Sequence, residues 1–343
     1  MKSENTHKLG IATVSLGWHP SHTIERKIDS IANQGYLGVE IYHPDLVTFA
    51  EQNGLAHLQA ASKIGDLCRA RGIQVIALQP LFDFAGVLTP LEDRLESARQ
   101  YVRLARALGA GIIQVPSTYE PNSIGDENTI VEELRALADV GKEEILESPS
   151  SEAILFAYET LAWGVHHASL DDAVRIVNLV DRENFGLCLD TYHVLARTWA
   201  DPHSANTGSG IIPGGVAALH ATLQRFKEQC PVEKIFYVQL SDAERLQQPL
   251  SLGHPGYKSE WAHWDATMHW CVWGRLFPFE SEFGAYFPMD EILRLWLKEK
   301  MWQGWVSMEI FHRDMDKESV GPEVLAERGY KSWLKIKDRI GLD

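Results

Sequence analysis

The amino-acid sequence predicts one (β/α)8 barrel, and three observations lead to that fold class. Short apolar runs alternate with longer helical patterns along all 343 residues, eight such pairs can be traced, and most runs are apolar on both strand faces. Strands covered on both faces are typical of parallel sheets, and eight successive strand–helix units favour a sheet that closes on itself. A doubly wound open sheet is the alternative. It ordinarily has fewer units and a glycine-rich phosphate-binding turn after the first strand, which Gly10 and Gly17 do not form.

The predicted strands are near-continuous apolar runs of four to seven residues. They are Leu9–Ser15, Gly38–Tyr42, Gln74–Gln79, Ile112–Val115, Leu155–Glu159, Phe185–Asp190, Ile235–Gln239 and Gly304–Ile310.

Helix starts can be placed between these strands. Thr89-Pro90-Leu91-Glu92 combines a capping-box pattern with proline at the first helical position, and it predicts a helix to about Leu108 that Gly109 ends. Ser169-Leu-Asp-Asp172 predicts another, with acidic groups at the positive helix end. The remaining helices are expected from the isoleucines at 24, 28 and 31 and near 55–71, 128–140, 216–229, 289–300 and 322–340.

Composition narrows the class of protein. Apolar residues make up 45% and charged residues 23% of the chain, and no segment approaches the length of apolar sequence that spans a bilayer. The start, Met1 to Lys8, is polar, and the four cysteines form no Cys-x-x-Cys pair. A net charge of −15 without clustered Lys and Arg argues against a nucleic-acid partner. We expect a cytoplasmic, single-domain protein (1–343) without a membrane partner.

One connection is unusually long and rich in tryptophan. Residues 242–288 follow the seventh predicted strand, so in a barrel they would lie over the C-terminal face, where active sites form. We interpret this insertion as a lid or as a subunit contact in a homo-oligomer. An insertion packed on the barrel rim without a function is the alternative. Its aromatic residues are Trp261, Trp264, Trp270 and Trp273, with His254, His263 and His269 among them.

Polar side chains end four neighbouring strands of the predicted barrel. Glu159, Asp190, Gln239 and Glu309 close the fifth to eighth strands. Carboxylates brought together repel one another, and a divalent cation relieves that repulsion. Because all four offer oxygen ligands, the set suits Mg²⁺ or Mn²⁺, with Co²⁺ as a substitute, better than Zn²⁺. The alternative for each residue alone is a polar group bonded to a neighbouring loop.

His193 lies three residues beyond Asp190. Its position is compatible with a fifth metal ligand, a structural histidine or a general base beside the metal. The last role would use the ability of imidazole to change protonation near neutral pH.

Several of these segments carry a resemblance. The chain resembles the xylose-isomerase-like barrel family of sugar isomerases, epimerases and dehydratases, and within it the fungal 3-dehydroshikimate dehydratases of quinate catabolism, from about Leu9 to Ile340. The matching runs are Leu9-Gly-Ile-Ala-Thr-Val-Ser-Leu-Gly17, Gly35-Tyr-Leu-Gly-Val-Glu-Ile41, Leu78-Gln-Pro80, Ile113-Gln-Val-Pro116, Tyr158-Glu-Thr-Leu-Ala-Trp163, Asn184-Phe-Gly-Leu-Cys-Leu-Asp-Thr191, Phe236-Tyr-Val-Gln239, Asp242-Ala-Glu244, Gly253-His254 and Gly304-Trp-Val-Ser-Met-Glu309. Gln239, where many sugar epimerases place histidine, is among the more specific features.

The resemblance implies a chemistry and a set of site residues. It implies metal-dependent dehydration of 3-dehydroshikimate to protocatechuate, with Glu159, Asp190, Gln239 and Glu309 as metal ligands and His193 as the base. Bacterial relatives use an arginine after the Gln-Pro turn, which this chain lacks. For the substrate carboxylate we therefore expect Arg245 and His254. Further substrate-binding candidates are Gln79, Gln114 and Trp163.

Other functions remain as alternatives. A ketose epimerase or isomerase would keep the metal but need a second proton-transfer group and ordinarily a histidine ligand, and Gln239 speaks against it. A dehydratase of an inositol-derived ketone is chemically closer. A non-catalytic metal or ligand sensor would bind without turnover. A DNA-repair nuclease would need more metal-binding histidines and a basic face.

Overall fold

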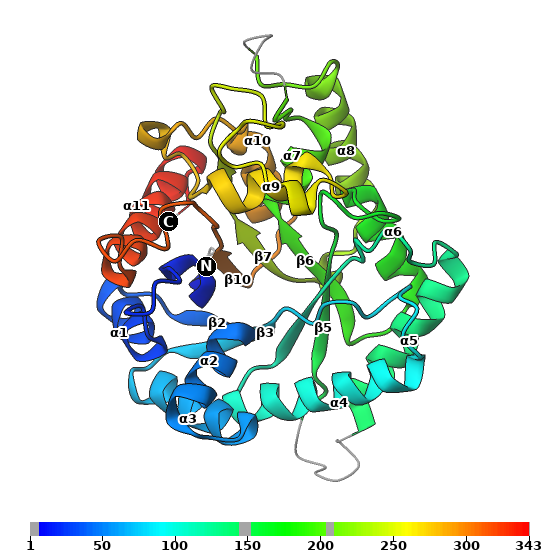
Figure 1. The fold of residues 1–343 in the computed structure, drawn as a ribbon. Helices are drawn as coiled ribbons and strands as arrows, with labels where there is room; N and C mark the ends of the chain where they lie inside the picture. Colours follow the sequence, from blue (N-terminus) through cyan, green and yellow to red (C-terminus); the bar gives the residue numbers. More distant parts are fainter. Residues whose placement is uncertain (1–6, 144–151, 204–208, 343) are drawn as a thin grey trace, which may run out of the picture.

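The strands form one closed parallel barrel. The computed structural model describes residues 7–143, 152–203 and 209–342, so residues 1–6, part of the polar start used above, lie outside the described residues. The strand order around the barrel is β1-β10-β7-β6-β5-β4-β3-β2, with every pair parallel. Figure 1 shows the barrel in the centre with helices around its outside. The predicted fold class is confirmed.

The strand bounds agree closely with the apolar runs. They are β1 Lys8–Ala12, β2 Gly38–Tyr42, β3 Gln74–Gln79, β4 Ile112–Pro116, β5 Leu155–Glu159, β6 Phe185–Asp190, β7 Ile235–Leu240 and β10 Trp305–Met308. The first strand is shorter than predicted because Thr13–Leu16 turns into a 3-10 helix, and the last ends at Met308 rather than at Ile310.

The predicted helices are present, and within the described residues three further α-helices were not predicted. The predicted ones are α1 Ile24–Gln34, α3 His57–Ala70, α4 Leu91–Leu108, α5 Glu127–Glu143, α6 Leu170–Val180, α8 Gly215–Gln229, α10 Met289–Arg294 with a π-helical continuation Leu295–Glu299, and α11 Pro322–Ile340. The unpredicted ones are α2 His43–Asn53, α7 Thr191–Thr198 and α9 Ala266–Gly274.

The two predicted helix starts have different outcomes. At α6, Ser169 Oγ accepts from the Asp172 N–H at 3.1 Å and the Asp172 carboxylate accepts from the Ser169 N–H at 3.1 Å, which is the capping box. At α4 the prediction was wrong by one residue. Pro90 itself occupies the cap position, without a side-chain cap hydrogen bond, so the Thr89 capping box does not form.

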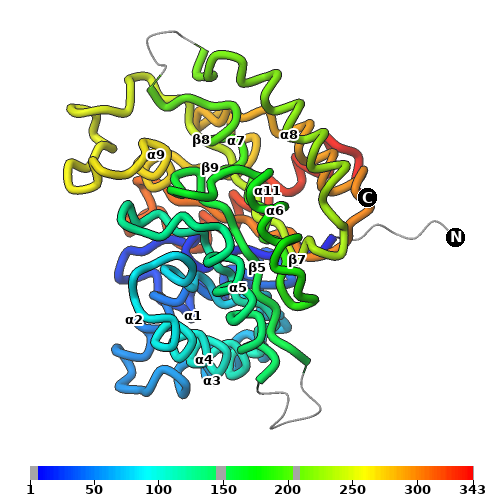
Figure 2. Tube along the Cα trace, turned by 90° about the vertical axis from the view of Figure 1, so that its right-hand side faces the viewer, coloured from blue at the N-terminus to red at the C-terminus, as the bar shows by residue number. Residues whose placement is uncertain are grey.

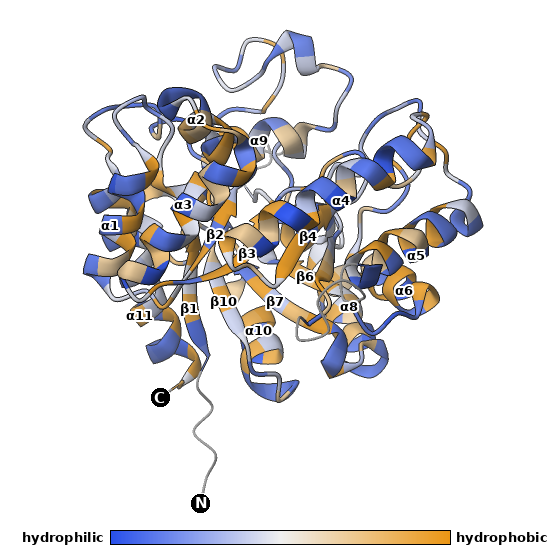
Figure 3. Cartoon of the chain, turned by 90° about the horizontal axis from the view of Figure 1, so that it is seen from below, coloured by the Kyte–Doolittle hydropathy of each residue, from blue (hydrophilic) through white to orange (hydrophobic). Residues whose placement is uncertain are grey.

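The apolar core surrounds the barrel and leaves a polar layer at one end. The main cluster fills the space between strands and helices, and a smaller cluster includes Ile76, Ile112, Ala157 and Tyr237. Figure 3 shows orange on β4 and β6 and paler colours on β7 and β10, with α9 and its connections at one end of the strands. No helix among the described residues is long and apolar enough to cross a membrane.

The insertion at 242–288 leaves the barrel and returns beside its own start. β8 Asp242–Ala243 pairs antiparallel with β9 Arg275–Leu276. The Asp242 carboxylate accepts from the backbone N–H groups of Ala243, Phe279, Tyr286 and Phe287 at 2.8–3.3 Å. In Figure 2 the insertion, drawn in yellow, lies on the side of the molecule opposite the C-terminus.

Candidate active site and metal centre

The structure brings the four predicted metal ligands to one end of the barrel. Glu159 ends β5, Asp190 ends β6, Gln239 lies near the end of β7, and Glu309 follows β10. Asp190 is the register partner of Gln239 across β6 and β7. All four side chains are buried, with at most 3% of each residue exposed. Parallel strands deliver their C-terminal ends to one face of a barrel, which is why sequence-distant groups meet here.

Amide side chains connect these carboxylates. Gln239 Nε2 donates to Glu309 Oε1 at 3.0 Å, and Gln79 Nε2 donates to the same oxygen at 2.8 Å. Gln114 Nε2 donates to Glu159 Oε2 at 2.9 Å. The predicted substrate-binding residues Gln79 and Gln114 therefore contact the carboxylates directly.

Burial and mutual repulsion act on the carboxylates. Burial, together with the charges of Asp190 and Glu309, raises the pKa of Glu159 well above its usual value. Burial raises the pKa of Asp190 to about 6 despite the opposing charge of Arg275. A cluster of this kind is stabilised by positive charge placed between its members.

Arg275, which the sequence analysis missed, supplies one such charge. It is 1% exposed, and its Nη2 bonds Asp190 Oδ2 and lies 3.0 Å from Glu309 Oε2. Its Nε donates to Ser241 Oγ at 2.8 Å, and its guanidinium lies 5.2 Å from the centre of the Tyr192 ring. Arg275 begins β9, so it is the insertion that brings this cation to the barrel.

The donor set fits a divalent metal ion. Three carboxylates and one guanidinium leave the cluster negative, and Glu159, Asp190 and His193 each place a ligand atom within 4.8 Å of the others. Gln239 donates to Glu309 through Nε2, while its Oε1 accepts from Gln114 Nε2 at 3.4 Å. The carboxylates make the set one dominated by oxygen, which hard divalent cations prefer. The residues present thus suit a small cation.

Glu40 is a further carboxyl group beneath this cluster. It lies within β2, it is 0% exposed, and its Oε2 accepts from Gln239 Nε2 at 2.9 Å. Burial, with the nearby charge of Glu309, raises its pKa to about 8. The sequence held a signal for it, because a glutamate between Val39 and Ile41 interrupts an apolar strand.

His193 lies beside the cluster with its two ring nitrogens in different surroundings. Nδ1 accepts from the backbone N–H of Ala162 at 3.0 Å. Nε2 lies 3.9 Å from Glu159 Oε1 and 4.0 Å from Asp190 Oδ2. Burial and the charge of Arg275 lower the pKa of His193 well below its usual value.

A cavity of about 140 Å³ opens between these groups and the insertion. Its lining includes Glu159, His193, Arg275 and Glu309 together with Gln79, Gln114 and Trp163, and α9 adds Met268, Cys271 and Val272. Two predicted residues are not part of the lining. Arg245 is exposed. His254 packs edge-on against Trp273, with 5.7 Å between ring centres. The expectation that these two bind the substrate carboxylate is therefore not supported by their placement.

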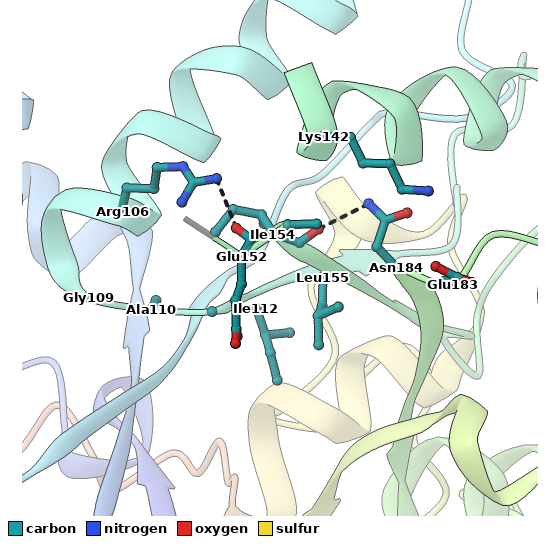
Figure 4. A pocket seen from close by; sticks show the side chains of 12 residues that line it. Arg106, Gly109, Ala110, Ile112, Lys142, Glu152, Ile154, Leu155, Glu183 and Asn184 are labelled. Carbon is teal, nitrogen blue, oxygen red and sulfur yellow. Dashed lines mark hydrogen bonds between the residues drawn. The ribbon is translucent and has the colours of Figure 1, made fainter. Parts of the chain in front are cut away.

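A larger cavity, of about 620 Å³, lies at the opposite ends of the strands. It is lined by residues that precede β4, β5 and β6, among them Arg106, Lys142, Glu152 and Asn184 (Figure 4). Arg106 Nη2 donates to the Glu152 carbonyl at 3.1 Å, and Asn184 Nδ2 donates to the Ile154 carbonyl at 3.1 Å. In barrels the N-terminal ends of the strands serve stability, so the smaller cavity is the candidate active site.

The barrel and its carboxylate-lined cavity define a class of protein. A family model described as xylose isomerase-like TIM barrel matches residues 28–336, and the chain belongs to this family. It is 38% identical to a 3-dehydroshikimate dehydratase of Neurospora crassa over 96% of this chain and 93% of that protein.

Two further matches are to longer proteins. The chain is 30% identical to a 3-dehydroshikimate dehydratase of Pseudomonas putida over 69% of this chain, a match that spans 31% of that protein. Among solved structures, a xylose isomerase-like TIM barrel/4-hydroxyphenylpyruvate dioxygenase fusion protein is similar with a TM-score of 0.73 and 25% identity. That match covers 98% of this chain and 43% of the fusion protein.

Proposed function

We propose that the protein is a 3-dehydroshikimate dehydratase, a carbon–oxygen lyase that removes water from 3-dehydroshikimate and forms protocatechuate. The proposal is supported by the 38% identity to the Neurospora crassa enzyme over nearly the whole of both chains. The observation that carries it within the structure is the cavity, which is lined by the buried carboxylates Glu159 and Glu309 and by the buried Arg275, whose guanidinium also bonds Asp190.

The size of the cavity suits this substrate class. About 140 Å³ is close to the volume of an engineered protein cavity that accepts benzene, so the space holds one six-membered ring. The walls combine apolar side chains such as Pro80 and Phe311 with the polar groups of the carboxylate cluster. An apolar wall with a few polar groups is the usual design of a small-molecule site.

We propose one divalent metal ion as the cofactor, Mg²⁺ or Mn²⁺ with Co²⁺ as a substitute, held by Glu159, Asp190, Gln239 and Glu309. When bound, such an ion polarises the ketone and the adjacent hydroxyl of the substrate and acidifies the C–H bond between them. The carboxylates supply the oxygen ligands, and Gln79 and Gln114 orient them through the hydrogen bonds at 2.8 and 2.9 Å.

The chain's own residues provide the proton transfers. The proton leaving carbon goes to a carboxylate, and Glu159 is the best placed. It lines the cavity, and among the described residues the contact of its Oε1 with Cys188 Sγ is long, at 4.0 Å. The electron pair of the C–H bond forms the new C=C bond as the neighbouring C–OH bond breaks. The transferred proton leaves with the hydroxyl as water, and a further proton shift makes the ring aromatic.

Arg275 takes over the role expected of Arg245 and His254. Among the described residues that line the cavity, it is the only arginine or lysine. It offsets the carboxylates, and its Nη1, which also donates to Cys271 Sγ at 3.7 Å, is the cationic donor left for the substrate. Trp163 stays a proposed substrate-binding residue on the same wall. We also propose a cytoplasmic location, since all four cysteines are buried and unpaired.

The proposal is tested by mixing the metal-loaded protein with 3-dehydroshikimate and following the near-ultraviolet absorbance of protocatechuate. A chelator-treated sample and free ketoses serve as controls. We expect metal-dependent appearance of product and no change with the ketoses. Turnover of a ketose without turnover of 3-dehydroshikimate would reassign the protein to the epimerases of the same family.

A further inference from the structure

His193 has only one arrangement of its ring proton that satisfies the protein around it. A neutral imidazole carries one N–H and one lone pair. Because a backbone amide can only donate, the hydrogen bond from the Ala162 N–H at 3.0 Å places the lone pair on Nδ1. The ring proton must then be on Nε2, the nitrogen on the side of Glu159 and Asp190.

The surroundings hold the ring in this orientation. Trp163 and Tyr192 meet the imidazole edge-on, with ring centres 4.9 and 5.5 Å from it. The segment that carries the Ala162 N–H is itself fixed, since the N–H of the preceding Leu161 donates to Ser117 Oγ at 3.0 Å. Exchanging the ring proton to Nδ1 would set two buried N–H groups against each other, which is unfavourable.

Nε2 faces the site without a protein partner at hydrogen-bonding distance among the described residues. The oxygens of Glu159 and Asp190 lie 3.9 and 4.0 Å away, too far for a hydrogen bond. On the same wall, Trp163 Nε1 is a second buried donor without a partner in the described part of the chain. His193 Nε2–H is therefore the N–H group that this wall offers to a molecule in the cavity, and Trp163 Nε1 lies buried behind the surface of the wall.

We propose that His193 acts as a neutral hydrogen-bond donor that presents Nε2–H to a substrate oxygen, and that it is not the base of the reaction. The proposal rests on the proposed function for its substrate, an oxygen-rich cyclic ketone. A base would need a lone pair facing the cavity, and the only lone pair of the ring already accepts from Ala162. A fixed donor instead stabilises the oxygen on which negative charge grows as the proton leaves carbon.

The first test needs no substrate. Nitrogen chemical shifts of the histidine rings in ¹⁵N-labelled, metal-free protein report the tautomer directly, and the His193 signals are identified by their absence in His193→Gln. We expect the neutral form with the proton on Nε2. A proton on Nδ1 would overturn the proposal, whatever the protein's activity.

The second test compares three substitutions with the wild-type protein. His193→Gln places an amide N–H near the position of Nε2 but offers no base, His193→Asn keeps an acceptor for Ala162 without reaching the cavity, and His193→Ala removes both. Removing a preorganised donor typically lowers kcat about 10²-fold. We expect that loss for Ala and Asn, and recovery of about tenfold by Gln.

The outcomes separate the donor role from a base and from the proposed function. Gln as inactive as Ala, with metal binding retained in both, would point to a base and against a donor. His254→Gln, outside the cavity lining, is the matched control and should leave kcat unchanged. A wild-type protein without dehydratase activity would refute the proposed function, and the tautomer measurement would still decide the proton position.

Discussion

Arg275 is a buried cation shared by two proposed metal ligands. We expect its replacement by methionine to lower the free energy of unfolding by an amount that depends on whether metal is bound. The change removes the bonds to Asp190 and Glu309 but keeps much of the side-chain volume. Removing one partner of a buried ion pair costs about 3–5 kcal/mol, because the remaining charges are left uncompensated. We expect a loss of this size in the free energy of unfolding of the metal-free protein.

The metal should restore most of that loss. Arg275 Nη2 bridges the two carboxylates where a divalent ion would have to contact both, so ion and guanidinium repel each other in the wild-type protein. In Arg275→Met the ion becomes the only counter-charge, so metal should bind more tightly and stabilise the variant more than the wild type.

Urea unfolding with a chelator and with saturating Mn²⁺, together with titration calorimetry of metal binding, measures both effects. Arg245→Met is the matched control, because Arg245 is exposed and outside the cavity lining, and it should change stability by less than about 0.5 kcal/mol. An Arg275→Met protein that is destabilised equally with and without metal, or that binds metal more weakly, would refute the reasoning.

Three further predictions follow from single residues. Glu309→Ala should abolish metal binding and activity together while circular dichroism still reports a folded barrel; full activity would remove Glu309 from the ligand set. Asp242→Ala should lower the free energy of unfolding by about 3 kcal/mol in urea, because four backbone N–H groups lose their acceptor; an unchanged midpoint would contradict this. His312 is buried, and burial with the neighbouring Arg313 lowers its pKa from 6.5 to about 4. As pH falls, the unfolded chain therefore binds a proton at His312 before the folded protein does. The free energy of unfolding should fall by about 3 kcal/mol between pH 6.5 and pH 4. Its change with pH should be smaller in His312→Asn, and an equal change would exclude His312 as the cause.

The barrel could be predicted because its strands are buried on both faces. Gly38–Tyr42 and Phe185–Asp190 were predicted with the observed bounds. A short apolar run flanked by turn residues is typical of a strand that is buried on both faces of a parallel sheet. The four strand-end residues followed from the same logic, because a polar group that closes an apolar strand must meet its neighbours at the barrel face.

Two of the three unpredicted α-helices lack a periodic signal. Helix α7 begins directly after Asp190 and is buried over most of its length, so no polar face separates it from the strand before it. Helix α9 combines tryptophans with Met268 and Cys271, without the alternation that marks a surface helix. Hydrophobic periodicity detects a helix that has one solvent-exposed face, and these two helices expose little of their surface.

The missing arginine had no local signal either. Arg275 lies far along the insertion, and nothing around it in the sequence says that β9 returns to β8. The expectation for Arg245 depended on its place after the seventh strand, in a segment that resembles the family, whereas its side chain is exposed in the structure. The place of His193 after β6 left three roles open, and the resemblance implied the base. The sequence could not show that the Ala162 N–H donates to Nδ1, the contact from which we infer that the proton is on Nε2.

The paired strands β8 and β9 form a closed neck at the start of the insertion, and the segment beyond this neck could be exchanged without disturbing the barrel. The N–H of Glu244 donates to the Gly274 carbonyl at 2.8 Å, and the N–H of Arg245 donates to the Gly284 carbonyl at 2.9 Å. These two hydrogen bonds hold the first residues of the insertion against its later residues. Arg275, which faces the proposed metal site, belongs to this neck, whereas residues 251–264 lie beyond it and are exposed or half-buried apart from Gly256. Recombination could therefore exchange that outer segment and alter which substrates enter the cavity. The contacts of Arg275 with Asp190 and Glu309 would be kept. A chain shortened there should still bind Mn²⁺ with its original affinity.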